Sequence, residues 1–379
     1  MRRFAFFALI SLISTIWLLA ATMSEVRAQA PLPIQADAGS FFHQVTLVNG
    51  DSSRTGYRQA VSPMAVHTPL LGGTISLSSA FMYTEQSQDS TSIDVWGPLA
   101  TELRGDWALS FARMTGFAIL PTGKSHLDAV DSTLVSTLYR SDLNFPVRSF
   151  GEGLDLGGAI TVAHQRDHLG ASLGVAYTSR GAYEPFESEG DYRPGDEATF
   201  AGGLSYSDAA WTLSVDLAGT FLFTDRLDGL VVFQNGKQVI ARGGFRYETR
   251  QYKLVLEATE IFRFKDRRLT ISGPAVGRLL FADNNRNDFR ASSLLSWNPA
   301  PTLSLFGSGN VKMIASTKDN DGNVVLTSAR LYGYGGGLSF QVGRTEHLDL
   351  SMTRYGGWIE EGARDLEGWN VRVNVRLLF

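Results

Sequence analysis

The chain contains no cysteine in 379 residues, which excludes disulfide cross-links and thiolate metal sites. Beyond Ala21 it also lacks an apolar run long enough for a membrane-spanning helix, so the rest of the chain can cross a membrane only as strands. The charges are nearly balanced, with 34 Lys and Arg residues against 38 Asp and Glu residues. This balance provides no basic face and excludes nucleic acid as an expected partner.

The N-terminus has the pattern of an export signal. Arg2 and Arg3 precede the apolar stretch 4–21, and Val26-Arg27-Ala28 follows as a small-residue cleavage motif. These three parts are typical of a secretory signal peptide, cleaved here after Ala28 and used in general secretion. An uncleaved membrane anchor is the alternative, because the apolar stretch is longer than usual.

Residues 369–379 alternate strictly between apolar and polar side chains. Only a β-strand separates the two kinds in this way, because its side chains point to opposite faces in turn. An aromatic residue at each end of the apolar row fits the girdles that flank a hydrocarbon band. The apolar row comprises Trp369, Val371, Val373, Val375, Leu377 and Phe379, and the polar row comprises Asn370, Arg372, Asn374 and Arg376.

The same alternation predicts about sixteen strands. Their expected ranges are 39–48, 57–67, 73–84, 92–103, 107–119, 153–165, 169–180, 196–207, 210–223, 237–249, 251–265, 286–297, 302–316, 328–343, 345–357 and 367–379. Alternation is poor in the first pair of ranges, so fourteen strands with a short N-terminal plug is the alternative.

Every second connection between these strands is expected to be short, and the others are long. The short turns are predicted around Arg344, Asn298–Pro301, Arg250, Asp208, Asp167, Gly105 and Pro69–Gly72. Together with the closing strand that ends in Phe379, this regularity resembles the bacterial outer-membrane β-barrels. The likeness is to channels of about 14 to 16 strands, among them diffusion porins and channels for fatty acids and aromatic compounds. The stretch Leu120–Lys124 also resembles one in barrels of the aromatic-compound kind.

The resemblance implies an all-β fold: a transmembrane up-and-down antiparallel barrel with short periplasmic turns and long external loops. The expected organisation is a signal peptide at 1–28, a periplasmic segment at 29–38 and one barrel domain at 39–379. The expected partners are outer-membrane lipid and lipopolysaccharide, the barrel-assembly machinery and periplasmic chaperones, and small solutes. The apolar row that ends in Phe379 would serve as the assembly signal. The stretch 31–56 lacks the Asn-Pro-Ala hatch pattern of fatty acid channels, which argues against a lateral hydrophobic path.

If the apolar rows face lipid, the polar rows line the lumen, and their charges divide along the chain. Inward acidic residues before position 225 are Asp94, Glu102, Asp155 and Asp216. Inward basic residues after it are Arg242, Arg246, Lys253, Arg290, Lys312, Arg372 and Arg376, offset in part by Glu248, Glu257 and Asp349. We expect an acidic wall opposite a basic one and a mild preference for anions. The alternative is that these charges pair across strands and fill the interior.

The longest connection, 120–152, carries Leu127, Val130, Leu134 and Leu138 at the spacing of one helix face. It is predicted either to fold into the lumen and narrow the pore or to cap the barrel mouth. A second long connection, 266–285, is also rich in apolar residues.

Enzyme and metal signatures are weak. Pro121–Ser125 resembles the tail of a phosphate-binding loop, but Ala118 stands where that loop needs glycine. Asp319–Gly322 lacks the spacing of a calcium loop, and the six His residues have no metal-site spacing. We therefore expect no cofactor, no metal and no catalytic residues. An acidic loop is either solvated or binds divalent cations that bridge lipopolysaccharide; its residues are Glu187, Glu189, Asp191, Asp196 and Glu197.

The sequence thus favours a passive channel for small solutes. A structural or adhesive barrel with a plugged lumen is the second hypothesis, and a barrel hydrolase is the third.

Overall fold

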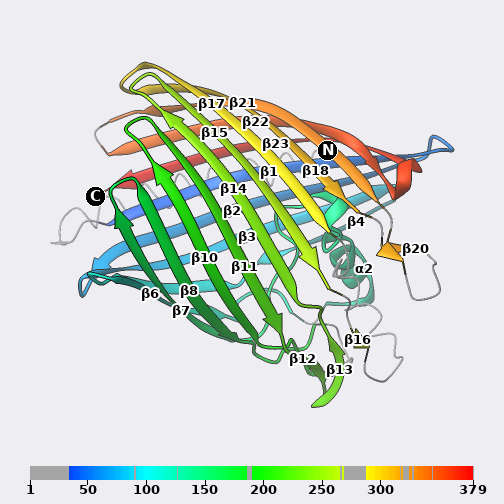
Figure 1. The fold of residues 1–379 in the computed structure, drawn as a ribbon. Helices are drawn as coiled ribbons and strands as arrows, with labels where there is room; N and C mark the ends of the chain where they lie inside the picture. The colour runs from blue at the N-terminus through cyan, green and yellow to red at the C-terminus, as the bar shows by residue number, and fades with distance from the viewer. Residues whose placement is uncertain are drawn as a thin grey trace, which may run out of the picture.

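The computed structural model describes residues 34–378, except 89–90, 126, 186–189, 265–266, 269–286, 316, 319–323, 327 and 344. Seventeen strands form one antiparallel sheet, which closes on itself between the last strand and the first (Figure 1). Two of these strands are parts of one interrupted strand, so the barrel has sixteen strand positions. The predicted all-β up-and-down barrel and its strand number are confirmed.

The barrel strands are β1 (Gln35–Asn49), β2 (Arg54–Leu70), β3 (Gly73–Gln88), β4 (Thr91–Pro98), β5 (Thr101–Ala108), β6 (Ala112–Leu120), β7 (Asp155–Arg166), β8 (Leu169–Ser179), β10 (Glu197–Ser207), β11 (Trp211–Leu222), β14 (Gln238–Glu248), β15 (Tyr252–Arg263), β17 (Asp288–Ala300), β18 (Leu303–Ile314), β21 (Ala329–Gln341), β22 (Glu346–Ile359) and β23 (Arg364–Leu378). The long connections contain β9 (Tyr192–Arg193), β12 (Thr224–Leu227), β13 (Leu230–Gln234), β16 (Arg267–Arg268), β19 (Thr317–Lys318), β20 (Val324–Leu326), α2 (Ala129–Leu138), and the 3₁₀ turns η1 (Ser141–Leu143) and η2 (Glu360–Gly362).

The first strand is a full member of the wall. β1 pairs with β2 on one side and with β23 along its whole length on the other, from Gln35 opposite Leu378 to Asn49 opposite Arg364. The fourteen-strand alternative with an N-terminal plug is therefore wrong. β1 begins four residues before the predicted start at position 39, within the stretch expected to precede the barrel.

The wall is interrupted between β4 and β5. β3 pairs Phe81 with Pro98 of β4 and Ser78 with Glu102 of β5, so the register shifts by one residue at the break. The turn predicted at Gly105 is also wrong, because Gly105 lies inside β5 and the chain turns at 109–111 instead. A Cβ at position 105 would meet the ring of Trp107, so this glycine makes room for an aromatic side chain.

The outer face carries a band of exposed apolar side chains. In β8 and β11 the outward rows are those predicted, with Leu173 68% and Val215 58% exposed. Directly paired residues of neighbouring strands point to the same face, so the pairing extends this assignment around the barrel. Such a continuous exposed apolar surface fits contact with hydrocarbon rather than water. Phe379 lies outside the described residues; the rest of the predicted apolar row of β23 shares its face with Leu348, Leu350 and Met352 of β22.

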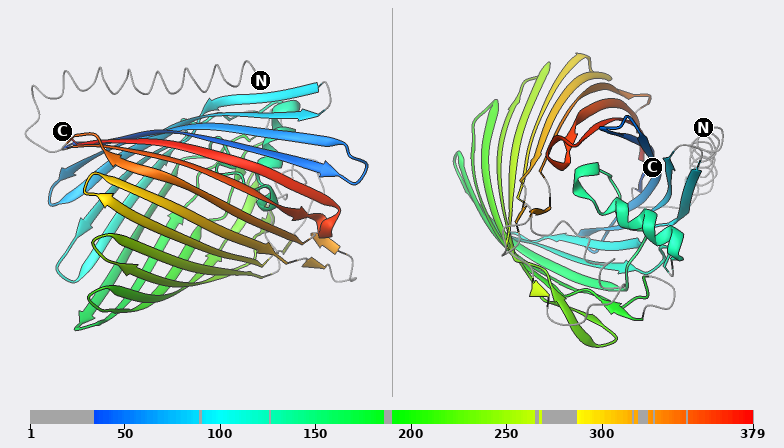
Figure 2. Two further views of the ribbon diagram at one scale, coloured as in Figure 1. Left: turned by 90° about the horizontal axis from the view of Figure 1, so that it is seen from above. Right: turned by 90° about the vertical axis from the view of Figure 1, so that its right-hand side faces the viewer.

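The strand connections at one end are short, and those at the other end are long. None of the helices among the described residues has the length and apolar character needed to span a membrane. The long connection after β6, residues 121–154, enters the ring of strands, where α2 lies inside (Figure 2). We call this stretch the lumenal segment.

Candidate functional site

The lumenal segment turns inward at the Pro121-Thr122-Gly123 stretch that the sequence singled out. The backbone N–H of Lys124 donates to the carbonyl of Pro98, and that of Ala100 donates to Phe150. A Cβ at Gly123 would lie 2.1 Å from the carbonyl oxygen of Phe150, so only glycine permits this approach. The stretch therefore joins the two ends of the lumenal segment at the break between β4 and β5.

α2 begins at Asp128, whose carboxylate accepts hydrogen bonds from the backbone N–H groups of Val130 and Asp131. Its buried face includes Leu134 and Leu138, and Leu127 before the helix is buried with them, as predicted. Val130, also predicted on this face, is 52% exposed, so that part of the prediction is wrong. Val135 is buried instead of Val130. The apolar face of the helix that makes the contact is therefore shifted by one position from the predicted row.

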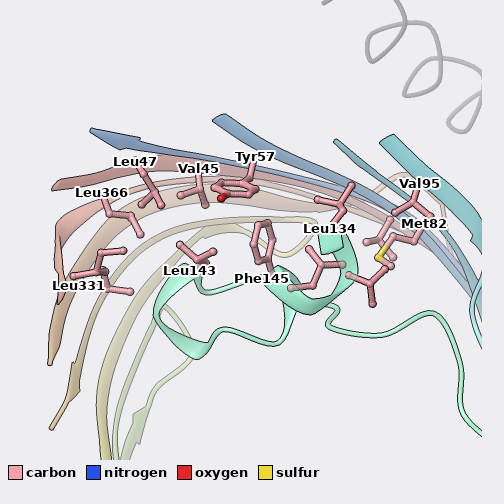
Figure 3. Close-up of a cluster of buried hydrophobic side chains, with 14 of the residues drawn as sticks. Val45, Leu47, Tyr57, Met82, Val95, Leu134, Leu143, Phe145, Leu331 and Leu366 are labelled. Carbon is pink, nitrogen blue, oxygen red and sulfur yellow. The ribbon is translucent and has the colours of Figure 1, made fainter. Parts of the chain in front are cut away.

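The segment packs against inward-facing apolar residues of the barrel wall (Figure 3). These residues form one continuous stretch of wall, since β1 pairs with β23. They are Val45, Leu47, Tyr57, Met82 and Val95 of β1 to β4, and Leu331, Tyr355, Ile359 and Leu366 of β21 to β23. Leu134, Leu143 and Phe145 meet side chains on the inner face of the strands.

Polar contacts reinforce this packing. Gln59, fully buried on β2, accepts a hydrogen bond from the backbone N–H of Val147 and donates to its carbonyl at 2.8 Å. His43 on β1 stacks on Tyr355 and meets the edge of Phe145. The Tyr355 hydroxyl donates to the carbonyl of Gln44 and lies 2.8 Å from His43 Nε2. These bonds satisfy polar groups that would otherwise be buried without partners.

An ion-pair chain ties the segment to the rim of the barrel. Arg140 contacts Asp142 at 2.7 Å and Glu360 of η2 at 3.1 Å. Burial alone would lower the pKa of the Arg140 guanidinium, but these two carboxylates outweigh it and raise the pKa. Arg148 has a lowered pKa because it is buried and faces Arg290 and Arg263. The lumenal segment thus brings its own cation beside the basic strands.

The predicted lumen charges lie on the inner face, with one exception. Asp94 is on the same face of β4 as the exposed Trp96, and the buried Val95 is on the other face, so Asp94 points outward. The register shift before β5 reverses the alternation that placed it inside. The residues that share the inner face are Glu102, Asp155, Asp216, Arg242, Arg246, Lys253, Arg290, Lys312, Arg372 and Arg376.

The sequence-based prediction missed several inward cations, among them Arg263 of β15 and Arg364 of β23. Arg104 and Arg113 contact Asp106 at the short-turn end, and Arg180 contacts Asp155 at the long-connection end. Arg104 fell where a turn was expected, Arg113 lay within the predicted strand 107–119, and Arg180 was the last residue of the predicted strand 169–180. The first half of the inner wall is therefore less acidic than predicted, although the second half keeps its basic excess.

Several predicted charges are paired. Arg376 donates to Asp37 at 2.8 Å, Arg290 contacts Asp288, and Arg246 contacts Glu248. Arg376 and Asp37 pair across strands, as the alternative predicts, whereas Arg290 and Arg246 each pair with a carboxylate two residues away on the same strand. Arg372 has no carboxylate partner among the ion pairs of the described residues; its guanidinium lies 5.4 Å from the ring of Phe41.

A hydrogen-bonded chain of Asp37, His67 and Ser76 lies on the inner face near the short-turn end. His67 Nδ1 is 2.7 Å from the Ser76 hydroxyl, and its Nε2 is 3.3 Å from Asp37. β3 is paired on both sides here, with His67 and Arg104 opposite Ser76, so the ladder uses the backbone N–H groups that an oxyanion would need. The arrangement forms a polar network on the inner face.

Among the described residues, no group of three His, Asp or Glu side chains has the geometry to hold a metal ion. Of the predicted acidic loop, Glu187 and Glu189 lie outside the described residues, as does Asp319–Gly322. Asp196 contacts Arg193, and Glu197 contacts Arg180. The apolar connection 266–285 also falls outside the described residues, apart from β16.

No family model matches the chain, and no curated protein matches its sequence. Among solved structures, the backbone is similar to OccK9 (OpdG) of Pseudomonas aeruginosa, with 9% identity over 92% of this chain and 99% of that chain and a TM-score of 0.46. It is also similar to OccK7 (OpdD) of Pseudomonas aeruginosa, with 9% identity, coverage of 92% and 100%, and a TM-score of 0.45. An anion-selective porin from Comamonas acidovorans gives 11% identity, coverage of 91% and 99%, and a TM-score of 0.39. These values describe the backbone course and say nothing of what this chain transports.

Proposed function

We propose that the protein is a passive outer-membrane channel for small solutes. The observation that carries this proposal is the exposure of inward-facing side chains in the middle of the wall. Ala201, Asp216, Arg242 and Glu257 face the inside of a closed barrel and yet remain exposed. Water therefore reaches the interior beside β10, β11, β14 and β15, as a pore requires.

The membrane and its sidedness follow from the same barrel. The exposed apolar band suits hydrocarbon, and in bacterial barrels the short turns lie on the periplasmic side. The long connections then face outward, and the lumenal segment enters the barrel from that side. Export through a signal peptide at 1–28 remains part of this proposal.

Selectivity in this proposal comes from two features. The lumenal segment occupies the side of the interior next to β1–β4 and β21–β23. The solute path is therefore narrower and runs along the opposite side of the interior. Inward cations outnumber inward carboxylates from β14 to β23, so anions are favoured in that half. Small anionic or neutral solutes are the substrates that this arrangement suits.

Planar-bilayer recording of the refolded protein tests the proposal. We expect discrete conductance steps, with a reversal potential in a potassium chloride gradient that indicates anion preference. Arg372→Glu should shift the preference toward cations more than Arg376→Glu does. A glutamate at position 376 would face Asp37, and two adjacent carboxylates share a proton, which reduces the change in charge.

The outer-face residue Arg330 provides a matched control. It packs over Trp358 on the outer face, so Arg330→Glu changes the charge equally without touching the lumen. Its reversal potential should equal that of the unmodified protein. A silent bilayer would favour a plugged structural barrel, and hydrolysis of an ester or peptide by silent protein would favour a hydrolase.

A further inference from the structure

A cavity of about 200 Å³ lies at the long-connection end of the barrel. Three walls enclose it. α2 and the end of the lumenal segment form one, the connection between β8 and β10 forms the second, and the hairpin of β12 and β13 forms the third. It is therefore built from three separate connections rather than from one loop.

Aromatic rings line much of this cavity. Tyr139, Tyr183 and Tyr192 reach it from two of the walls, and the buried Phe150 and Phe233 complete the lining. Tyr183 and Tyr192 meet edge to face, with ring centroids 6.0 Å apart. Aromatic faces carry partial negative charge, so such a lining attracts organic cations.

The carboxylates of the cavity exceed its cations. Arg180 alone contacts Glu152, Asp155 and Glu197, at 3.1, 2.7 and 2.6 Å. Lys124, the other cation of the lining, is held by Asp131 outside it. A buried excess of negative charge is costly unless protons or a cation offset it. Burial raises the pKa of Glu152, although the adjacent Arg180 acts to lower it.

Asp225 is the carboxylate without a cation. It is 3% exposed, and its partners are neutral: the Tyr192 hydroxyl at 2.6 Å, the backbone N–H of Gly195 at 2.7 Å and the Asn235 amide. Among the described residues no ion pair reaches it. Burial raises the pKa of Asp225. Its carboxylate lies at the wall of a cavity lined with aromatic rings, with no ion-pair partner among the described residues.

We propose that this cavity binds a small organic cation of the ammonium class, held by the tyrosine rings and by Asp225. A metal ion is not the occupant, because the described carboxylates do not converge in a coordinating geometry. The hydroxyls of Ser136 and Ser149 on the lining suit a cation that also carries a hydroxyl group. The proposal does not rest on the channel function, because binding at this site needs no conduction, although Glu197 of β10 belongs to the lining.

Calorimetric titration of the refolded full chain in detergent tests the site. Choline is the probe, and 3,3-dimethylbutan-1-ol, its uncharged isostere, is the matched ligand. Choline should bind and the alcohol should not. Asp225→Asn should weaken choline binding about tenfold or more, since it removes the charge and keeps the shape. Asp167→Asn makes the same change in the short turn after β7, where the positive φ suits asparagine, and should leave binding unchanged.

Tyr183→Leu provides a second measurement that does not depend on the folding of the Asp225 variant. It removes one ring and should also weaken choline binding while the barrel stays folded. Equal binding of choline and the alcohol, absence of choline binding, displacement of choline by an equal concentration of potassium, or full affinity in Asp225→Asn would each overturn the proposal. Because binding is measured without conductance, a failure here leaves the channel proposal untouched, and a silent bilayer leaves this site untouched.

Discussion

The inner surface has two contrasting walls. In the covered wall, β1–β4 and β21–β23 turn apolar side chains inward, among them Val45 and Leu366, and the lumenal segment buries them completely. In the open wall, β7–β11 turn small residues such as Ser172 and Ala201 inward, and Ala201 is exposed. The difference teaches that inward apolar residues occur where another part of the chain covers them. A wall that faces water carries small or polar residues instead.

The largest effect specific to the covered wall is expected from replacing an apolar residue that anchors the lumenal segment. Leu134 is 1% exposed within the shared core. Leu134→Asp should cost about 4 kcal/mol of docking free energy, from the lost packing and the buried carboxylate. The segment should leave the covered wall, which increases single-channel conductance and speeds proteolysis within 121–154.

Val130→Asp is the matched control for this change. It places the same residue one turn earlier on α2, at a position that is 52% exposed. Its stability should change by no more than about 0.5 kcal/mol. Equal conductance and protease sensitivity in the two variants would mean that the segment is not held by this apolar face.

A smaller effect is expected from the polar clamp on the covered wall. Gln59→Ala leaves the backbone N–H and carbonyl of Val147 without their partner, which should cost about 1–3 kcal/mol. Hydrogen exchange near Val147 should become faster. Gln86→Ala removes the same side chain from the inner face of β3, where no hydrogen bond joins it to the described part of the segment, and exchange should stay unchanged. Faster exchange in both variants would assign the effect to the strands rather than to the clamp.

Much of the barrel was predictable from the sequence because alternation reports directly which face meets hydrocarbon. The strands with small inward residues, such as 169–177, gave the clearest signal, and the structure confirms them. The first pair of strands alternated poorly for a physical reason. Val45 and Leu47 face inward toward the lumenal segment, so both faces of β1 carry apolar residues. This feature suggested a plug before the barrel, whereas it marks contact with a segment that arrives from β6.

The errors in the site have equally specific causes. Alternation assumes an uninterrupted strand, and the extra residue between β4 and β5 reversed the face of Asp94. Asp225 was missed because it lies in a hairpin above the barrel, where no period applies. Helical spacing found Leu134 but assigned Val130 to the buried face, since spacing alone does not fix which edge of the apolar row meets the wall. Interactions between distant connections leave no local pattern in the sequence.

The smallest effect is expected in the open wall. Ala201 faces the lumen from β10 and is exposed, so Ala201→Leu adds volume where water now lies. Stability should change by no more than about 0.5 kcal/mol, while single-channel conductance falls slightly because the path is narrower. Ala198→Leu places the same side chain on the outer face of the same strand and should leave conductance unchanged. A strong loss of stability in Ala201→Leu would mean that this wall is packed against other side chains, and the contrast with the covered wall would then disappear.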